Sequence, residues 1–152
     1  MPSRRGLARC VAAVAMLSAL SACSGFGPTH SHVSSAVIGH FKGLPHSVTV
    51  PENRQRDPSE KPWAAWAGPR SIYVMTWGSS SCPNIPTSVD AAAVDLVFIR
   101  TVEHDFHPGD DACTEDMAVT TSLVRLPSSI DTTRALVVQI EDTKTRLPAG
   151  AS

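Results

Sequence analysis

The chain has 152 residues, of which 42% are hydrophobic, 18% charged and 5% aromatic, and its formal net charge is −1. This length suits one domain and leaves little room for two. The low charged fraction argues against a long polyelectrolyte tail, and the near-neutral balance offers no electrostatic footprint for nucleic acid. The composition indicates no molecular activity, so the function has to be sought in motifs.

The N-terminus has the pattern of an export signal over residues 1–22. Arg4, Arg5 and Arg9 give it a positive start, and residues 11–20 follow without a charge. An uncharged run of this length is typical of a signal peptide, whereas a membrane-spanning helix needs about 20 apolar residues. We therefore expect the chain to be exported.

The leader closes with Leu20-Ser21-Ala22-Cys23, which resembles the lipobox of bacterial lipoprotein precursors. In those precursors the Cys receives a diacylglyceryl group, and the leader is then cut off in front of it. The resemblance implies that Cys23 is lipidated and anchors the protein to the extracytoplasmic face of the cell membrane. Two acyl chains suffice for stable anchoring, because each buried CH2 contributes about 0.8 kcal/mol. The alternative is an ordinary signal peptide cleaved after Ala19 or Ala22, which leaves Cys23 unmodified.

Removing the leader, with its three arginines and no acid, leaves 130 residues, ten basic and fourteen acidic side chains, and a net charge of −4. This mild acidity argues against a basic patch for anionic lipid head groups. Small polar residues indicate a lipidated N-terminus and flexible tether over 23–35. We expect a single β-rich domain over 36–146 and a frayed tail over 147–152.

Four cysteines divide by position. Cys10 lies in the leader and Cys23 at the lipobox, which leaves Cys82 and Cys113 as an even pair in a chain bound for an oxidising compartment. A disulfide between these two is the simplest assignment, and it would stabilise a small domain with a limited core. A catalytic thiol or a metal ligand is the alternative, although the spacing matches no zinc motif.

The mature chain shows several short strand patterns separated by turns. Both faces of 71–77 are apolar or aromatic, which predicts a central strand. Residues 51–69 contain four prolines and six charged side chains, which predicts a loop. Trp63 and Trp66 in this loop are expected to cap an open edge of the core, with an exposed ligand platform as the alternative. The pattern predicts an all-β fold, a small antiparallel sandwich or meander, with strands at 46–50, 71–77, 87–91, 94–102, 118–126 and 135–140.

The motif Trp77-Gly78-Ser79-Ser80-Ser81-Cys82-Pro83 resembles a pattern in small, uncharacterised lipoproteins and secreted proteins of GC-rich Gram-positive bacteria. There a hydrophobic strand leads into the motif and a second Cys opens a later strand, the place that Cys113 holds here. The resemblance implies an exported β-rich domain with one disulfide and implies no activity. The serines match no Gly-x-Ser-x-Gly nucleophile elbow, and we expect these small residues to allow close backbone approach.

Residues 104–116 carry the strongest candidate chemistry. His104 and His107 lie beside several carboxylates, and with Asp110 and Asp111 they could hold zinc or copper. No EF-hand or standard zinc spacing is present, so a solvated acidic loop without a cofactor is the simpler interpretation.

By elimination, the sequence favours a lipid-anchored binding or structural protein of the cell envelope that has an unknown envelope protein or ligand as its partner and no catalytic residues. A metal-binding lipoprotein is the first alternative to this interpretation. An envelope hydrolase is the second, although no nucleophile and base can be paired by spacing.

Overall fold

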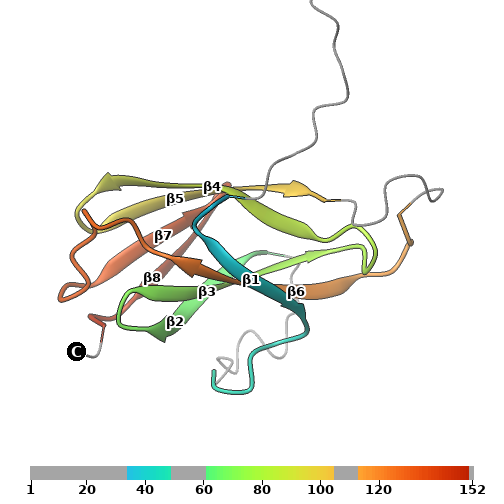
Figure 1. Cartoon of the computed structure of the whole chain (residues 1–152), viewed down its shortest axis with the longest axis horizontal. Coiled ribbons are helices and arrows are strands. Elements are labelled where there is room, and N and C mark those ends of the chain that lie inside the picture. Colours follow the sequence, from blue (N-terminus) through green and yellow to red (C-terminus); the bar gives the residue numbers. More distant parts are fainter. Residues whose placement is uncertain (1–33, 49–60, 105–112, 151–152) are drawn as a thin grey trace, which may run out of the picture.

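The structure, a computed structural model, describes residues 34–48, 61–104 and 113–150. These residues form two four-stranded sheets packed face to face and contain no helix (Figure 1). The first sheet has the strand order β1-β6-β3-β2 and the second β4-β5-β7-β8. The strands are β1 (Val37–Lys42), β2 (Trp63–Gly68), β3 (Ser71–Gly78), β4 (Asn84–Ala93), β5 (Leu96–Glu103), β6 (Ala118–Arg125), β7 (Leu136–Ile140) and β8 (Thr143–Leu147). The predicted all-β sandwich is confirmed.

The core lies between the two sheets and follows the alternation of the strands. Ile72 and Val74 of β3 belong to the same core cluster as Val97 and Ile99 of β5, and all four are 0–1% exposed. In a strand, successive side chains point to opposite faces, so the residues between them lie on the outer faces of the sandwich. The prediction of a central strand at 71–77 is confirmed, because β3 pairs with both β2 and β6.

One strand pair departs from the antiparallel pattern. β5 and β7 run parallel, with Val97 opposite Val138 and Ile99 opposite Ile140. Parallel neighbours need a crossover connection. Here β6 supplies it, because the chain leaves the second sheet after β5, forms β6 in the first sheet and returns as β7.

Hydrogen bonds close both long sides of the sandwich. On one side the Ser34 amide donates to the carbonyl of Pro86 at 3.2 Å. On the other side the indole Nε1–H of Trp66 donates to the carbonyl of Pro148 at 2.9 Å. Trp66 also packs against the core, which is the capping role expected of it, although it acts from a strand.

Two expectations for the N-terminal half are wrong. Residues 46–48 form a turn, and the strand lies earlier, at β1; residues 49–50 lie outside the described residues. The loop expected over 51–69 gives way to β2 from Trp63, while 51–60 lie outside the described residues. Trp63 is only 5% exposed and pairs with Met75, so a free ligand platform is not formed there.

The C-terminal prediction is also wrong. The strand expected at 135–140 is not the last, because β8 follows it in a tight hairpin. Leu147 is buried in the core, and the Gly150 amide donates to the carbonyl of Thr132 at 2.8 Å, so residues 147–150 are not frayed. Residues 151–152 lie outside the described residues. No helix in the described part of the chain is long and apolar enough to span a membrane.

Candidate functional site

The predicted disulfide is present. Cys82, in the loop after β3, is bonded to Cys113, ahead of β6, with the two Cα atoms 5.4 Å apart. This spacing is ordinary for a disulfide. The bond joins the two segments that lead out of β3 and into β6, strands that already pair along their whole length.

Hydroxyl groups reinforce the same junction. The Thr114 amide donates to Oγ of Ser81 at 2.9 Å, and the Thr114 hydroxyl lies 2.7 Å from that of Ser79. The Ser80 amide donates to Oδ1 of Asp116 at 3.0 Å, and the Thr114 hydroxyl donates to the same oxygen. These hydrogen bonds, first the one from Thr114, lower the pKa of Asp116 to about 2. We call Ser79, Ser80, Ser81, Thr114 and Asp116 the hydroxyl clasp.

Gly78 shows the close approach that the motif predicts. A Cβ at this position would stand 3.1 Å from Nδ2 of Asn84 and 3.2 Å from its backbone nitrogen. The three serines that follow Gly78 are small, and they also form the hydrogen bonds of the hydroxyl clasp. The sequence did not predict that role, since it depends on Thr114 arriving beside them.

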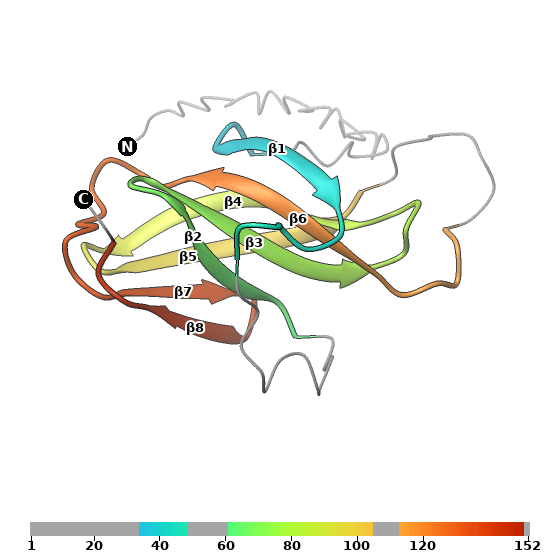
Figure 2. The same ribbon diagram turned by 90° about the horizontal axis from the view of Figure 1, so that it is seen from below.

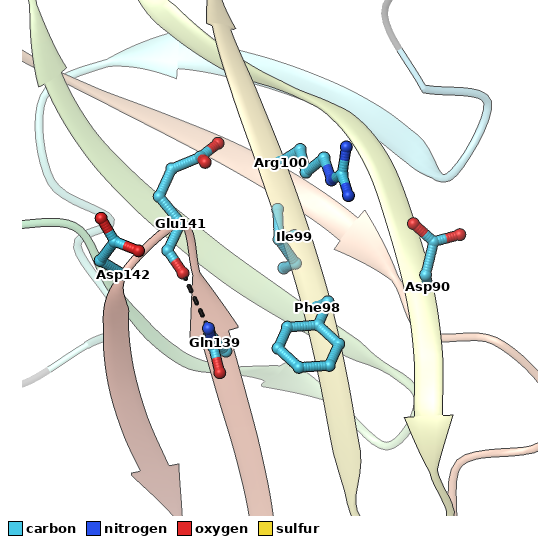
Figure 3. A pocket seen from close by; sticks show the side chains of 7 residues that line it. All are labelled: Asp90, Phe98, Ile99, Arg100, Gln139, Glu141 and Asp142. Carbon is cyan, nitrogen blue, oxygen red and sulfur yellow. Dashed lines mark hydrogen bonds between the residues drawn. The ribbon is translucent and has the colours of Figure 1, made fainter.

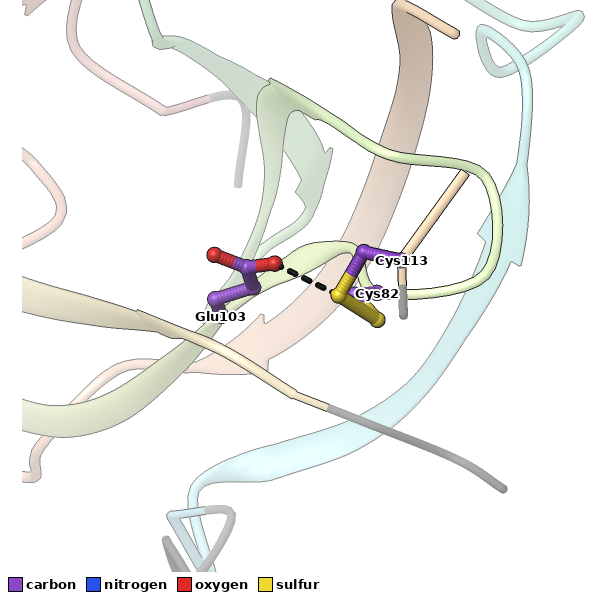
Figure 4. A group of neighbouring side chains, drawn as sticks. All are labelled: Cys82, Glu103 and Cys113. Atoms are coloured by element: carbon purple, nitrogen blue, oxygen red, sulfur yellow. Dashed lines mark hydrogen bonds between the residues drawn. A yellow bond between two sulfur atoms is a disulfide. The ribbon is translucent and has the colours of Figure 1, made fainter. Parts of the chain in front are cut away.

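Within the described ranges, one group of side chains has the composition of a metal site. Cys82, Glu103 and Cys113 bring their ligand atoms within 4.8 Å of one another, and Oε1 of Glu103 lies 2.8 Å from Sγ of Cys113 (Figure 4). Zinc and copper bind cysteine as thiolate. Because both sulfur atoms are joined in the disulfide, this group has no thiolate to offer, and its arrangement does not support a metal centre.

The predicted histidine site falls mostly outside the described residues, which exclude His107, Asp110 and Asp111. His104 is described at the end of β5, where its amide donates to the carbonyl of Pro83 at 3.0 Å. This contact places His104 beside the loop that carries Cys82. The lipidation residue Cys23 and the leader also lie outside the described residues.

A pocket lies on the outer face of the second sheet. Val97 and Ile99 point into the core, so Phe98 and Arg100 of β5 point outward. Strand register puts Asp90 of β4 on one side of Phe98 and Gln139 of β7 on the other. The pocket has a volume of about 500 Å³ and is lined by Asp90, Phe98, Ile99, Arg100, Gln139, Glu141 and Asp142 (Figure 3).

Glu141 forms the rim of this pocket in an unusual backbone conformation. It is the first residue of the two-residue turn between β7 and β8 and has a φ of 48°. This left-handed conformation costs a non-glycine residue about 1–2 kcal/mol. Such strain persists where surrounding contacts impose it, and it is concentrated at functional sites.

Three neighbours fix Glu141. Its amide donates to the carbonyl of Ile99 at 3.1 Å, and its own carbonyl accepts from Nε2 of Gln139 at 3.0 Å. Its Oε1 accepts from the amide of Thr101 and, at 3.3 Å, from the hydroxyl of Thr101. The carboxylate thus takes the place of a strand carbonyl where β7 turns away from β5.

The turn separates the pocket from a second hollow of about 290 Å³ at the adjoining end of the sandwich. Glu141 and Asp142 line both spaces. The remaining lining of the second hollow is Pro62, Thr76, Trp77, Asn84, Thr101 and Thr143. The two spaces together present two aromatic rings, two side-chain amides, one guanidinium and three carboxylates, which suits a polar ligand that also has an apolar face.

Comparisons with protein-family models, with curated proteins and with solved structures found no match. None of the residues that line the pocket was predicted as a site residue from the sequence. Their only sequence signal was the polar spacing within 94–102, which put Phe98 and Arg100 on the same face of one strand.

Proposed function

We propose that this protein is a lipid-anchored, extracytoplasmic binding module of the bacterial cell envelope, whose ligand site is the pocket on the second sheet. The lipobox at Leu20-Ser21-Ala22-Cys23 supports the anchor and the location. The disulfide supports export, because such bonds form and persist in oxidising compartments and are rare in the cytosol.

The observation that carries the binding role is the conformation of Glu141. A glycine would adopt its positive φ without a steric penalty, and glycine is the common choice in such turns. Glycine has no carboxylate, whereas the carboxylate of Glu141 lies between two solvent-open hollows. The strain is explained if this carboxylate both completes the sheet edge and shapes a ligand site.

The first experiment tests the anchor. Cys23→Ser should abolish incorporation of a labelled fatty acid and leave the protein unprocessed or released from the membrane. Cys10→Ser is the matched control, because it removes a leader cysteine outside the lipobox and should leave labelling intact. Labelling that persists in Cys23→Ser would disprove the anchor.

The second experiment tests the pocket in intact cells. A photo-cross-linking amino acid replaces Phe98 in the pocket or, as a control, Phe41 on the other outer face; these side chains are 37% and 40% exposed. We expect a discrete adduct from position 98 that position 41 does not give. Glu141→Gly should remove this adduct with little change in the thermal unfolding midpoint, since relief of strain offsets the lost hydrogen bonds. No adduct at position 98, or the same adducts at both positions, would exclude the pocket as the binding site.

A further inference from the structure

Exposed apolar side chains lie at the β1 end of the outer face of the first sheet. Ile38, Phe41 and Leu44 are 51%, 40% and 40% exposed. Phe41 packs edge-on against Tyr73, with ring centroids 6.3 Å apart. Tyr73 lies between the core residues Ile72 and Val74, so both rings belong to the outer face. We call Ile38, Phe41, Leu44 and Tyr73 the β1 face.

The chain after β1 is held against this surface. The Gly43 amide donates to the carbonyl of Val119 at 2.9 Å, and the Gly43 carbonyl accepts from the hydroxyl of Thr121 at 2.6 Å. These two bonds to β6 fix the backbone next to Leu44. The apolar side chains of the β1 face therefore occupy defined positions on one sheet and are not carried on a loose loop.

Charge is distributed unequally between the two sheets. The four strands of the first sheet, as the structure describes them, contain no Asp or Glu and carry Lys42 and Arg125 as their strong bases. The second sheet carries both signs: Asp90 and Glu103 in its strands and further acids in the β7–β8 turn, and also Arg100, Lys144 and Arg146. Anionic lipid head groups repel acidic side chains, so the strands of the first sheet oppose no such contact, whereas the second sheet would bring Asp90 and the acids of the β7–β8 turn to the head groups together with its bases.

The start of the domain limits how far it can lie from the anchor. Ten residues, 24–33, separate Cys23 from Ser34, and β1 begins three residues after Ser34, at Val37. Even fully extended, this segment reaches on the order of 35–40 Å. The lipid anchor therefore keeps the β1 face at a high effective concentration next to the bilayer.

We propose that the β1 face lies on the surface of the bilayer into which Cys23 is inserted, with Phe41 and Leu44 at the head-group boundary. The inference rests on the proposed lipid anchor. Exposed aromatic and apolar side chains are typical of surfaces that bind the membrane interface. Because the outer faces of a sandwich point in opposite directions, this orientation turns the pocket on the second sheet away from the bilayer (Figure 2).

The test uses the lipidated full chain in vesicles of equal parts phosphatidylcholine and phosphatidylglycerol with brominated acyl chains, which quench nearby tryptophan fluorescence. Phe41→Trp and Phe98→Trp place a reporter on each outer face at matched exposure, and each is compared with the unsubstituted protein. We expect the added emission of Phe41→Trp to fall by roughly twofold or more and that of Phe98→Trp to stay unchanged. Leu44→Glu in the Phe41→Trp protein, which places an acid on the β1 face, should weaken the quenching.

Stronger quenching at position 98 than at 41, equal quenching at both, or none at either overturns the proposed orientation. The mass of the purified protein separates this failure from loss of the anchor. If the acyl mass on Cys23 is missing, the anchor itself is disproved, and the orientation with it. If the acyl mass is present and Phe41→Trp is not quenched, only the orientation is wrong.

Discussion

Removal of the disulfide is the perturbation whose size follows most directly from the fold. The bond closes a loop with a sequence separation of 31. In Cys82→Ala/Cys113→Ala the hydroxyl clasp still joins the same two segments, and β3 still pairs with β6. The native positions should therefore be kept, and the main change should be the additional freedom of the unfolded chain.

For a loop of this length the chain-entropy relation gives about 12 cal/mol/K, or about 3.7 kcal/mol at 25 °C. Domains of this size have a free energy of unfolding of about 5–15 kcal/mol. The expected loss is smaller than that, so the variant should still fold in the absence of urea. With a urea m-value near 1.5 kcal/mol/M, the denaturation midpoint should fall by about 2.5 M.

The assay is urea unfolding followed by tryptophan fluorescence for the parent, the parent with reductant and the double variant. The reduced parent keeps the buried Cys82 side chain. The difference in free energy of unfolding between the reduced parent and the double variant therefore measures the effect of the small cavity left by alanine. Both the reduced parent and the double variant should lose most of the stabilisation of about 3.7 kcal/mol that the disulfide provides. A midpoint within roughly 0.5 M of the oxidised parent in both would refute the reasoning, since the clasp would then hold the loop closed in the unfolded chain as well.

Three further predictions concern single side chains. The pKa of Asp116 is lowered from 3.8 to about 2, so its stabilising contribution is complete above pH 3.8 and is lost as the pH falls toward 2; Asp116→Asn should flatten the pH dependence of the unfolding midpoint in that window. Gly78→Ala should destabilise the fold by about 1–3 kcal/mol in urea because its Cβ meets the Asn84 backbone, whereas Gly39→Ala, with nothing within 4 Å, should show no such clash penalty. The buried hydroxyl of Ser122 has no hydrogen-bond partner among the described residues, so Ser122→Ala should raise the free energy of unfolding by about 1 kcal/mol; a fall would show that the hydroxyl is bonded.

The sequence predicted the strands whose alternation is strong and missed those whose pattern is weak. β3 and β6 were placed nearly to the residue, because both faces of β3 are apolar and a proline follows soon after β6. β8 was not predicted because it is an edge strand in which only Leu147 is buried, so its sequence shows no apolar alternation. β2 was missed because the prolines and charges before Trp63 favoured a loop over the entire segment.

Proline also misled the prediction for β4. Its start was placed after Pro86, yet the strand begins at Asn84. β4 is at the edge of the second sheet, where a proline without an N–H costs no ladder hydrogen bond, and the carbonyl of Pro86 accepts from Ser34 instead. Whether a strand lies at an edge depends on the other strands, so the local sequence could not show it.

The disulfide could be predicted because it follows from the number of cysteines and the expected compartment, without knowledge of topology. The pocket could not, because it combines β4, β5 and the β7–β8 turn, and the parallel pairing of β5 with β7 depends on the crossover through the other sheet. The positive φ of Glu141 carries no sequence signal either, since the turn holds neither glycine nor asparagine.

The absence of acids from the strands of the first sheet links the proposed anchor to the proposed ligand pocket. A sandwich needs apolar residues only between its layers, so the composition of each outer face is free to vary independently. In this protein the strands of the first sheet contain no acid and expose apolar side chains at β1, whereas the opposite face holds carboxylates, bases and the strained turn. If the anchor merely tethered the domain, nothing would favour acids on one face over the other. A bilayer next to β1 does favour this arrangement, because it repels carboxylates from that face and leaves the pocket open to ligands from the side of the solvent.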